Sequence, residues 1–167
     1  MNFREDGFTI IELFVVLAIV AILAITAVPS FITYLQTSKL TGASQGLYDA
    51  LRYARSESLK RNVNVYVSIQ TGSSWCYGIN TSSTCTCSSG NSCTLGRTTA
   101  PASSQLTLSA TGLTSSAVRF EPNHGAAGSA STITFTNAQG NNISVRVRLL
   151  GNLLLCSSTV SGYAACS

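Results

Sequence analysis

One carboxylate stands inside the most apolar stretch of the chain. From Phe8 to Val28 the only charged residue is Glu12. As a helix this run would span roughly 30 Å, enough to cross a bilayer. A charged side chain in hydrocarbon costs on the order of 2.5–3.5 kcal/mol even on lenient insertion scales, so such a residue is a functional candidate by default. Glu12 therefore needs a cationic partner that its own segment does not contain.

The polar residues before this run suggest where the cation comes from. Met1–Gly7 is short and ends in a small residue, and no A-x-A-like site follows the apolar core, so it is not an ordinary secretory signal. Cleavage after Gly7 would leave Phe8 with a free α-amine four residues before Glu12. We therefore expect the ammonium group of one chain to pair with Glu12 of a neighbouring chain in the membrane.

The segment Gly7-Phe8-Thr9-Ile10-Ile11-Glu12-Leu13, with the apolar run and Pro29, resembles the class III signal sequence of type IV pilins and type II secretion pseudopilins. By that resemblance a prepilin peptidase cuts after Gly7, removing a leader of residues 1–7, and methylates the new amino terminus at Phe8. Glu12 would guide packing into the filament. The resemblance also implies a single-pass inner-membrane protein with a periplasmic domain that later reaches the pilus or cell surface. A plain single-pass anchor is the alternative interpretation.

The helical pattern continues beyond Pro29, which is expected to kink the helix or loosen one turn. Apolar residues recur there at steps of three and four, opposite a polar face. This stripe consists of Leu40, Ala43, Leu47, Ala50, Leu51 and Ala54. We predict one helix from about Phe8 to about Arg61. Residues 8–28 would lie in the membrane or the filament core, and residues 29–61 would pack on a globular domain.

The period changes from 3.6 to 2 after Asn62. Valines and an isoleucine alternate with polar residues over 63–69, which predicts a half-buried strand. Further short strands are predicted over 75–79, 106–108, 118–120, 131–136, 143–149 and 153–156, and 81–97 is predicted to be an irregular loop. The predicted fold class is α+β, with a long helix followed by a β-sandwich-like domain over 62–167. This is the lollipop arrangement that the pilin resemblance implies.

Six cysteines occur, all between Cys76 and Cys166. A domain outside the cytoplasm lies in an oxidising compartment, so disulfides are expected. The spacing favours a Cys156–Cys166 bond that closes a C-terminal loop. The other four, which are Cys76, Cys85, Cys87 and Cys93, would pair among themselves in an order that the sequence does not decide. A metal site at Cys85-Thr-Cys87 is the alternative, but it lacks the usual zinc-ligand spacing and histidine partners.

Charge and chemistry argue against an enzyme. Charged residues make up 10% of the chain, and without residues 1–7 nine basic and four acidic residues remain, a net charge of +5. That charge is too small to imply nucleic-acid binding by itself. The G-x-S-x-G stretch around Ser44 lies in a helical pattern, where a hydrolase nucleophile does not work. With His124 as the only histidine, we expect no catalytic site, no cofactor and no metal.

Later segments resemble the GspH/FimT/FimU branch of pilin-like proteins. They are the helix 47–61 leading into the strand at 63–68, the motif Phe120-x-Pro122-x-x-Gly125, and a closing hairpin over 145–155. Members are initiating or minor subunits of pili or of secretion pseudopili, and some FimT proteins bind DNA. The cysteines and the long loop favour a FimU-like minor pilin, whose partners would be other minor and major pilins. A FimT-like DNA-uptake pilin and a GspH-like pseudopilin are the alternatives.

The resemblance to DNA-binding members is incomplete. Those members carry a Gly-Arg-x-Arg motif, whereas the equivalent position here is Gly151-Asn152-Leu153-Leu154, without arginines. Arg146 and Arg148 are one strand step apart and are predicted to face the same side. With Arg119 or Arg97 they would form a basic patch for phosphate contacts. A solvated strand face is the favoured interpretation, so DNA is a candidate partner but not the favoured one.

Overall fold

The computed structural model describes residues 8–89, 92–102 and 104–166, apart from the side chains of Thr26 and Ala27. The chain divides into two compact units, Met1–Gln36 and Thr37–Ser167. A single helix, α1 (Ile10–Arg61), contributes to both units. The predicted long helix is therefore confirmed.

The end of α1 is marked by its sequence. Lys60 and Arg61 lie in the last turn, where cations interact favourably with the helix dipole. Asn62 follows with a φ of 54°. Asparagine tolerates this left-handed conformation better than most residues, which makes it a suitable residue just past a helix end. The chain then reverses into the first strand.

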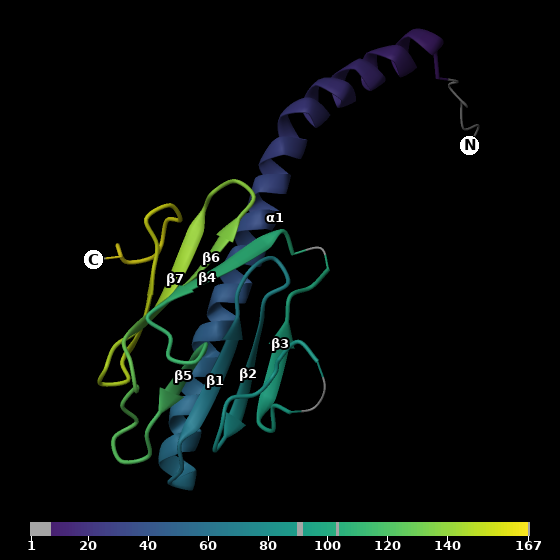
Figure 1. Ribbon diagram of the computed structural model, residues 1–167. Helices are drawn as coiled ribbons and strands as arrows, with labels where there is room; N and C mark the ends of the chain where they lie inside the picture. Colours follow the sequence, from purple (N-terminus) through teal and green to yellow (C-terminus); the bar gives the residue numbers. More distant parts are fainter. Residues whose placement is uncertain (1–7, 90–91, 103, 167) are drawn as a thin grey trace, which may run out of the picture. The chain divides into compact units, whose positions relative to one another are not determined.

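The second unit holds two antiparallel sheets of four strands (Figure 1). The first has the order β3-β2-β1-β5, and the second has the order β4-β6-β7-β8. The strands of the first are β1 (Val65–Gln70), β2 (Cys76–Thr81), β3 (Gly96–Thr99) and β5 (Ala117–Phe120). Those of the second are β4 (Leu106–Thr111), β6 (Ser131–Asn137), β7 (Asn142–Val147) and β8 (Leu153–Cys156). The predicted α+β class is confirmed.

One hydrophobic core joins α1 to the inward faces of both sheets. On β6 every second residue is buried, as the period of a half-buried strand requires. Burying a leucine, isoleucine or phenylalanine side chain contributes about 1.5–3 kcal/mol. The helix contributes four fully buried residues to this core, Leu40, Leu47, Leu51 and Ala54. The predicted apolar stripe is thus the surface that holds the helix to the sheets.

The irregular loop predicted over 81–97 is too long at both ends. β2 extends through Thr81, and β3 begins at Gly96. All four residues of β3 are exposed, and its backbone pairs with β2, with Thr99 opposite Cys76. Period-2 alternation marks only strands that have one buried face, so an exposed strand gives no such signal.

β7 ends at Val147, two residues before the predicted end, because the chain turns at Arg148–Gly151. The Gly151 N–H donates to the Arg148 carbonyl at 2.8 Å. Gly151 has a φ of 76°, which favours glycine, and an added Cβ would collide with the Gly125 carbonyl. The prediction that Arg148 is a strand residue is therefore wrong.

Candidate functional site

Glu12 lies in the first turn of α1, and Thr9 caps that turn. The Glu12 N–H donates to Thr9 Oγ1 at 3.3 Å, and Thr-x-x-Glu is the spacing of a capping box. A negative charge at this position is also favoured by the helix dipole. Phe8 is exposed just before the helix, whereas Gly7 and the predicted cleavage site lie outside the described residues. Of the two residues in this cap, Glu12 is predicted from the sequence to have a role and Thr9 is missed, although the Thr-x-x-Glu spacing signals both.

The first unit presents its apolar side chains to its surroundings. From Phe8 to Leu35 every large apolar side chain is exposed by 41% to 78%. An 18-residue window of this helix reaches a mean hydropathy of 2.9, so by length and composition the helix is able to cross a membrane. A helix that is apolar on all sides requires an apolar environment.

Pro29 lies inside this part of the helix without ending it. Proline has no N–H, so the Ile25 carbonyl loses its usual partner four residues later. One turn on, the Thr33 hydroxyl donates to the Pro29 carbonyl at 3.1 Å. A kink at Pro29 remains a prediction.

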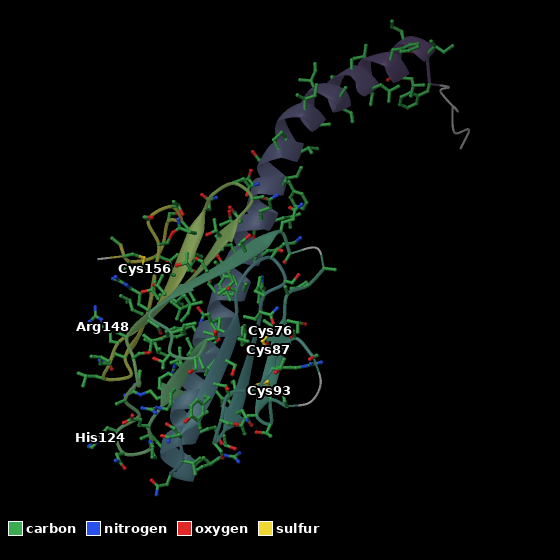
Figure 2. All side chains as sticks on the ribbon, viewed as in Figure 1. Cys76, Cys87, Cys93, His124, Arg148 and Cys156 are labelled. Carbon is green, nitrogen blue, oxygen red and sulfur yellow. A yellow bond between two sulfur atoms is a disulfide. The ribbon has the colours of Figure 1, made fainter. Side chains whose placement is uncertain are left out.

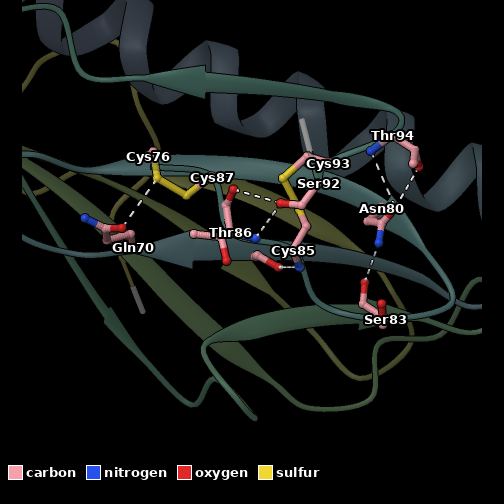
Figure 3. The surroundings of a disulfide bond; sticks show 11 residues. Gln70, Cys76, Asn80, Ser83, Cys85, Thr86, Cys87, Ser92, Cys93 and Thr94 are labelled. Carbon is pink, nitrogen blue, oxygen red and sulfur yellow. Dashed lines mark hydrogen bonds between the residues drawn. A yellow bond between two sulfur atoms is a disulfide. The ribbon is translucent and has the colours of Figure 1, made fainter. Parts of the chain in front are cut away.

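In the second unit, two disulfides staple the loop between β2 and β3. Cys76 bonds to Cys87, and Cys85 bonds to Cys93, so the two closed loops overlap in sequence (Figure 3). Asn80 anchors the loop to β2, because its amide donates to the Ser83 carbonyl at 3.2 Å and its oxygen accepts from the Thr94 hydroxyl at 2.7 Å.

Gly78 of β2 makes room for one of these disulfides. A Cβ at this position would collide with Cys93 Sγ and would stand 3.0 Å from Cys85 Sγ. The disulfide therefore packs directly on the strand, where any other residue would place a side chain. The loop is also tied to β1, since the Cys85 N–H donates to Ser68 Oγ at 2.9 Å. The outer face of the first sheet is thus covered by the stapled loop.

The third disulfide joins Cys156, at the end of β8, to Cys166. In Figure 2, Cys156 lies well apart from the labelled cysteines of the β2–β3 loop. The Ser157 N–H donates to the Ala164 carbonyl at 2.9 Å, so the tail also pairs with the chain just after β8. All six cysteines are bonded.

The four candidate arginines do not form one patch. Arg97 on β3 and Arg119 on β5 lie at opposite edges of the first sheet. Three strand spacings separate these edges, about 14 Å. Arg119 forms an ion pair with Glu121, with 2.7 Å between Nη2 and Oε1. Arg97 and Arg119 therefore do not both join one patch with Arg146 and Arg148, and the predicted contribution of one or the other remains a prediction.

Arg146 and Arg148 do lie together. Arg146 is on the outward face of β7, opposite Thr132 of β6, and Arg148 follows the end of that strand. Both residues line a shallow cavity of about 330 Å³. Figure 2 shows Arg148 projecting from the domain on the side away from Cys93. Arg146 and Arg148 therefore form a small basic site beside the second sheet.

A further residue, Arg55 of α1, ties two loops to the helix. Its Nε donates to the Gly125 carbonyl at 3.1 Å, and its Nη2 donates to the Leu150 carbonyl at 3.4 Å. The two loops follow β5 and β7, so Arg55 connects the helix to both sheets. Nothing in the local pattern marks Arg55, because its partners are 70 and 95 residues away in sequence.

The described residues show no arrangement typical of an active site. Among them, no group of three or more His, Cys, Asp or Glu side chains could hold a metal ion. Ser44 of the G-x-S-x-G stretch is buried within α1, where its hydroxyl donates to the Leu40 carbonyl at 2.9 Å. It therefore lacks the sharp strand-to-helix turn that exposes a hydrolase nucleophile. His124 lies in an exposed loop.

Comparison with known families matches both units. A family model described as type II transport protein GspH matches residues 43–152, about two thirds of the chain. A model of the prokaryotic N-terminal methylation motif matches residues 2–28. No curated protein and no solved structure matches the chain. The methylation motif and the exposed apolar helix fit an inner-membrane-anchored pilin, which is a structural rather than an enzymatic subunit. The chain therefore belongs to the GspH family, and it is a type IV pilin-like protein of the GspH/FimT/FimU type.

Proposed function

We propose that this protein is a FimU-like minor pilin that helps to start or cap a type IV pilus together with other minor pilins. The observation that carries the proposal is the exposed apolar segment of the first unit, residues 8–35, most of which is helical. Before assembly a lipid bilayer would surround it, with the second unit in the periplasm. After assembly the apolar helices of neighbouring subunits would take the place of lipid, and the protein would lie in the pilus at the cell surface.

The proposal gives a role both to cleavage of the leader and to the charge of Glu12. Under the proposal a prepilin peptidase cuts after Gly7 and methylates Phe8. The ammonium group of Phe8 then pairs with Glu12 of a neighbouring subunit. Breaking a buried ion pair by removing one partner typically costs about 3–5 kcal/mol, because the remaining charge is left uncompensated. The pair would therefore favour one register among the many in which apolar helices pack.

The second unit supports an exposed position for this subunit. All three disulfides lie in it, and two of them hold down a single long loop. Disulfides form and persist outside the cytoplasm, where they limit local unfolding of surface loops. The periplasm is oxidising too, so it is the long stapled loop, rather than the disulfides alone, that favours an exposed pilus subunit over a subunit of a periplasmic pseudopilus.

Deleting the gene for this protein tests whether it acts as a FimU-like pilin, a GspH-like pseudopilin or a DNA-uptake pilin. Surface pili, DNA uptake and protein secretion are scored separately, and each is restored with the wild-type chain. The proposal predicts the loss of surface pili. Loss of secretion with normal pili would identify a GspH-like pseudopilin, an alternative favoured by the description of the matching family model. Unchanged piliation would refute the FimU-like role.

DNA binding is a second candidate function, favoured only by the basic cavity at Arg146 and Arg148. A receptor that uses this site should retard DNA in a gel, and the binding should weaken with salt as phosphate counterions are released. The double variant Arg146→Gln, Arg148→Gln should bind less, whereas Arg97→Gln, at a distant sheet edge, serves as the matched control. Equal retardation by both variants, or none at low salt, would exclude this function for the site.

A further inference from the structure

A cavity of about 740 Å³ opens at one end of the β-domain. Its walls come from the β1–β2 turn, the β3–β4 connection, the start of β4 and the end of β6. The two sheets are tied together here, because Gly72 in the β1–β2 turn pairs with Leu108 of β4. The volume is typical of cavities that hold small ligands.

Two residues that line this cavity carry a buried side-chain donor with no acceptor among the residues that the structure describes. The two donors are the indole Nε1 of Trp75 and the side-chain Nδ2 of Asn137. The two side chains are 3% and 6% exposed. Buried polar groups are normally paired, and an unmade hydrogen bond is costly, so two unpaired donors beside one cavity require an explanation.

The orientation of the Asn137 amide follows from its surroundings. Its Oδ1 accepts from the backbone N–H groups of Gln139 and Asn141 at 3.1 and 2.9 Å. These two donors require the oxygen on that side and leave the NH₂ group on the other. The unpaired atom is therefore a donor, like the indole N–H, and the complementary ligand offers acceptors.

The lining of the cavity selects a neutral ligand. Every described lining residue is uncharged, and hydroxyl and amide groups alternate with small apolar surfaces such as Ala100 and Pro101. A charged ligand would lose its hydration without gaining an oppositely charged side chain to offset that cost. β3 and β4 are both edge strands. Only the last residue of β3 and the first two of β4 line the cavity, which is too short a stretch for an extended peptide to pair with. A neutral compound with many hydroxyl groups, which both donate and accept, matches this lining.

Hydroxyl groups continue from the cavity across the outer face of the second sheet. Thr107 lines the cavity and begins two facing rows on β4 and β6. Directly opposite side chains are about 4.5–5.5 Å apart at Cβ. Successive members of a row are about 7 Å apart. The facing pairs are Thr107 with Thr136, Ser109 with Thr134, and Thr111 with Thr132. A sugar chain with its end in the cavity would run along this surface.

We infer that the cavity binds the end of a neutral oligosaccharide, with the Trp75 indole N–H and the Asn137 amide donating to sugar oxygens. Both donors are covered in the free protein, so binding includes a small opening of the wall of the kind that side-chain rearrangement supplies. The site goes beyond the proposed assembly role and does not depend on it, since it lies wholly in the second unit.

The test uses the fact that Trp75 is the only tryptophan in the chain. Full-length protein labelled with ¹⁵N-tryptophan, in a detergent without a sugar headgroup, gives a single indole resonance. Maltotriose, cellotriose, mannotriose and triacetylchitotriose are the probes, and a trigalacturonic acid is the charged control. We expect a saturable downfield shift of the indole proton with at least one neutral trisaccharide and none with the charged one.

Variants separate binding from folding. Trp75→Phe deletes the N–H but keeps a ring against Phe135 and Tyr77. The smaller ring should lower the thermal midpoint moderately, because it leaves space in the core. Affinity is therefore measured by calorimetry well below that midpoint, where it should fall about tenfold. Tyr66→Phe, which removes a hydroxyl group from an aromatic residue outside the cavity lining, should leave the sugar affinity unchanged.

Four results would overturn the inference. They are the absence of a shift with all four neutral sugars, a shift only with the charged sugar or with an uncharged peptide, an indole N–H held by a buried water that no sugar displaces, and undiminished sugar affinity in Trp75→Phe.

Discussion

Replacing Gly78 by alanine is expected to break the Cys85–Cys93 disulfide or to force it off the sheet. The disulfide occupies the space in which a side chain at Gly78 would lie, with Cys93 Cβ at 3.1 Å and Cys85 Sγ at 3.0 Å from an added Cβ. These neighbours are covalently joined, so they cannot move aside independently. The perturbation is a single methyl group placed against one bond.

The size of the effect follows from the two ways in which the chain can respond. If the bond is lost, the unfolded chain regains the entropy of a loop whose ends are 8 residues apart. The chain-entropy description values this at about 2.5 kcal/mol at 25 °C. If the bond survives, overpacking costs about 1–3 kcal/mol. The free energy of unfolding should therefore fall by about 1–3 kcal/mol.

The assay is unfolding of the full-length protein in detergent, followed by the fluorescence of Trp75, with thiols counted by alkylation and mass spectrometry. Wild-type protein should show no free thiol, and two should appear in Gly78→Ala if the bond is lost. Gly42→Ala is the matched control, because an added Cβ there meets nothing within 4 Å. In a helix this control should leave stability unchanged or raise it by up to about 1 kcal/mol.

A second background tests the reasoning. In the double variant Cys85→Ala, Cys93→Ala the sulfurs are gone, so Gly78→Ala should then cost less than about 1 kcal/mol. The difference between the two backgrounds measures the coupling between the glycine and the disulfide. An equal cost in both backgrounds would refute the claim that the disulfide fills the place of the missing side chain.

Two further predictions concern the helix. Arg55→Gln removes donors to the Gly125 carbonyl and to the Leu150 carbonyl in a second loop. It should lower the free energy of unfolding by about 1–3 kcal/mol in denaturant titrations. A free energy within error of wild type would contradict a stabilising role for these hydrogen bonds. The hydrogen bond from Arg61 holds the pKa of Glu57 below its usual value of 4.5. A lowered pKa adds stability that is present above pH 4.5 and is lost as the pH falls through the folded-state pKa. On acidification the wild type should therefore lose stability more steeply than Glu57→Gln, and parallel curves would contradict this assignment.

The helix could be predicted from the sequence because its signals are local. The apolar run after Phe8 and the stripe from Leu40 to Ala54 repeat at helical spacing, and Asn62 marks the change of period. The strands with one buried face were predictable for the same reason. β3 was not, because all four of its residues are exposed and its order comes from pairing with β2.

Features that depend on distant residues could not be predicted in this way. Four cysteines within 76–93 allow three pairings, and the choice depends on how the loop folds back over Gly78. Arg55 donates hydrogen bonds to residues far away in sequence. The cavity beside Trp75 and Asn137 is likewise lined by segments that are far apart in sequence. Alternation placed Arg146 correctly on an outward strand face, but the turn at Gly151 removed Arg148 from that strand.

The most direct test of the proposed assembly role is the amount of Glu12→Ala protein in sheared pili. The variant should reach the membrane fraction at the wild-type level, because removing a charge from an apolar helix favours insertion. Its amount in pili should fall at least about tenfold, because the partner ammonium group is left uncompensated. Asp49→Ala, which removes an exposed acid from the second unit, is the matched control and should be incorporated normally. Incorporation of Glu12→Ala at the wild-type level would contradict the account.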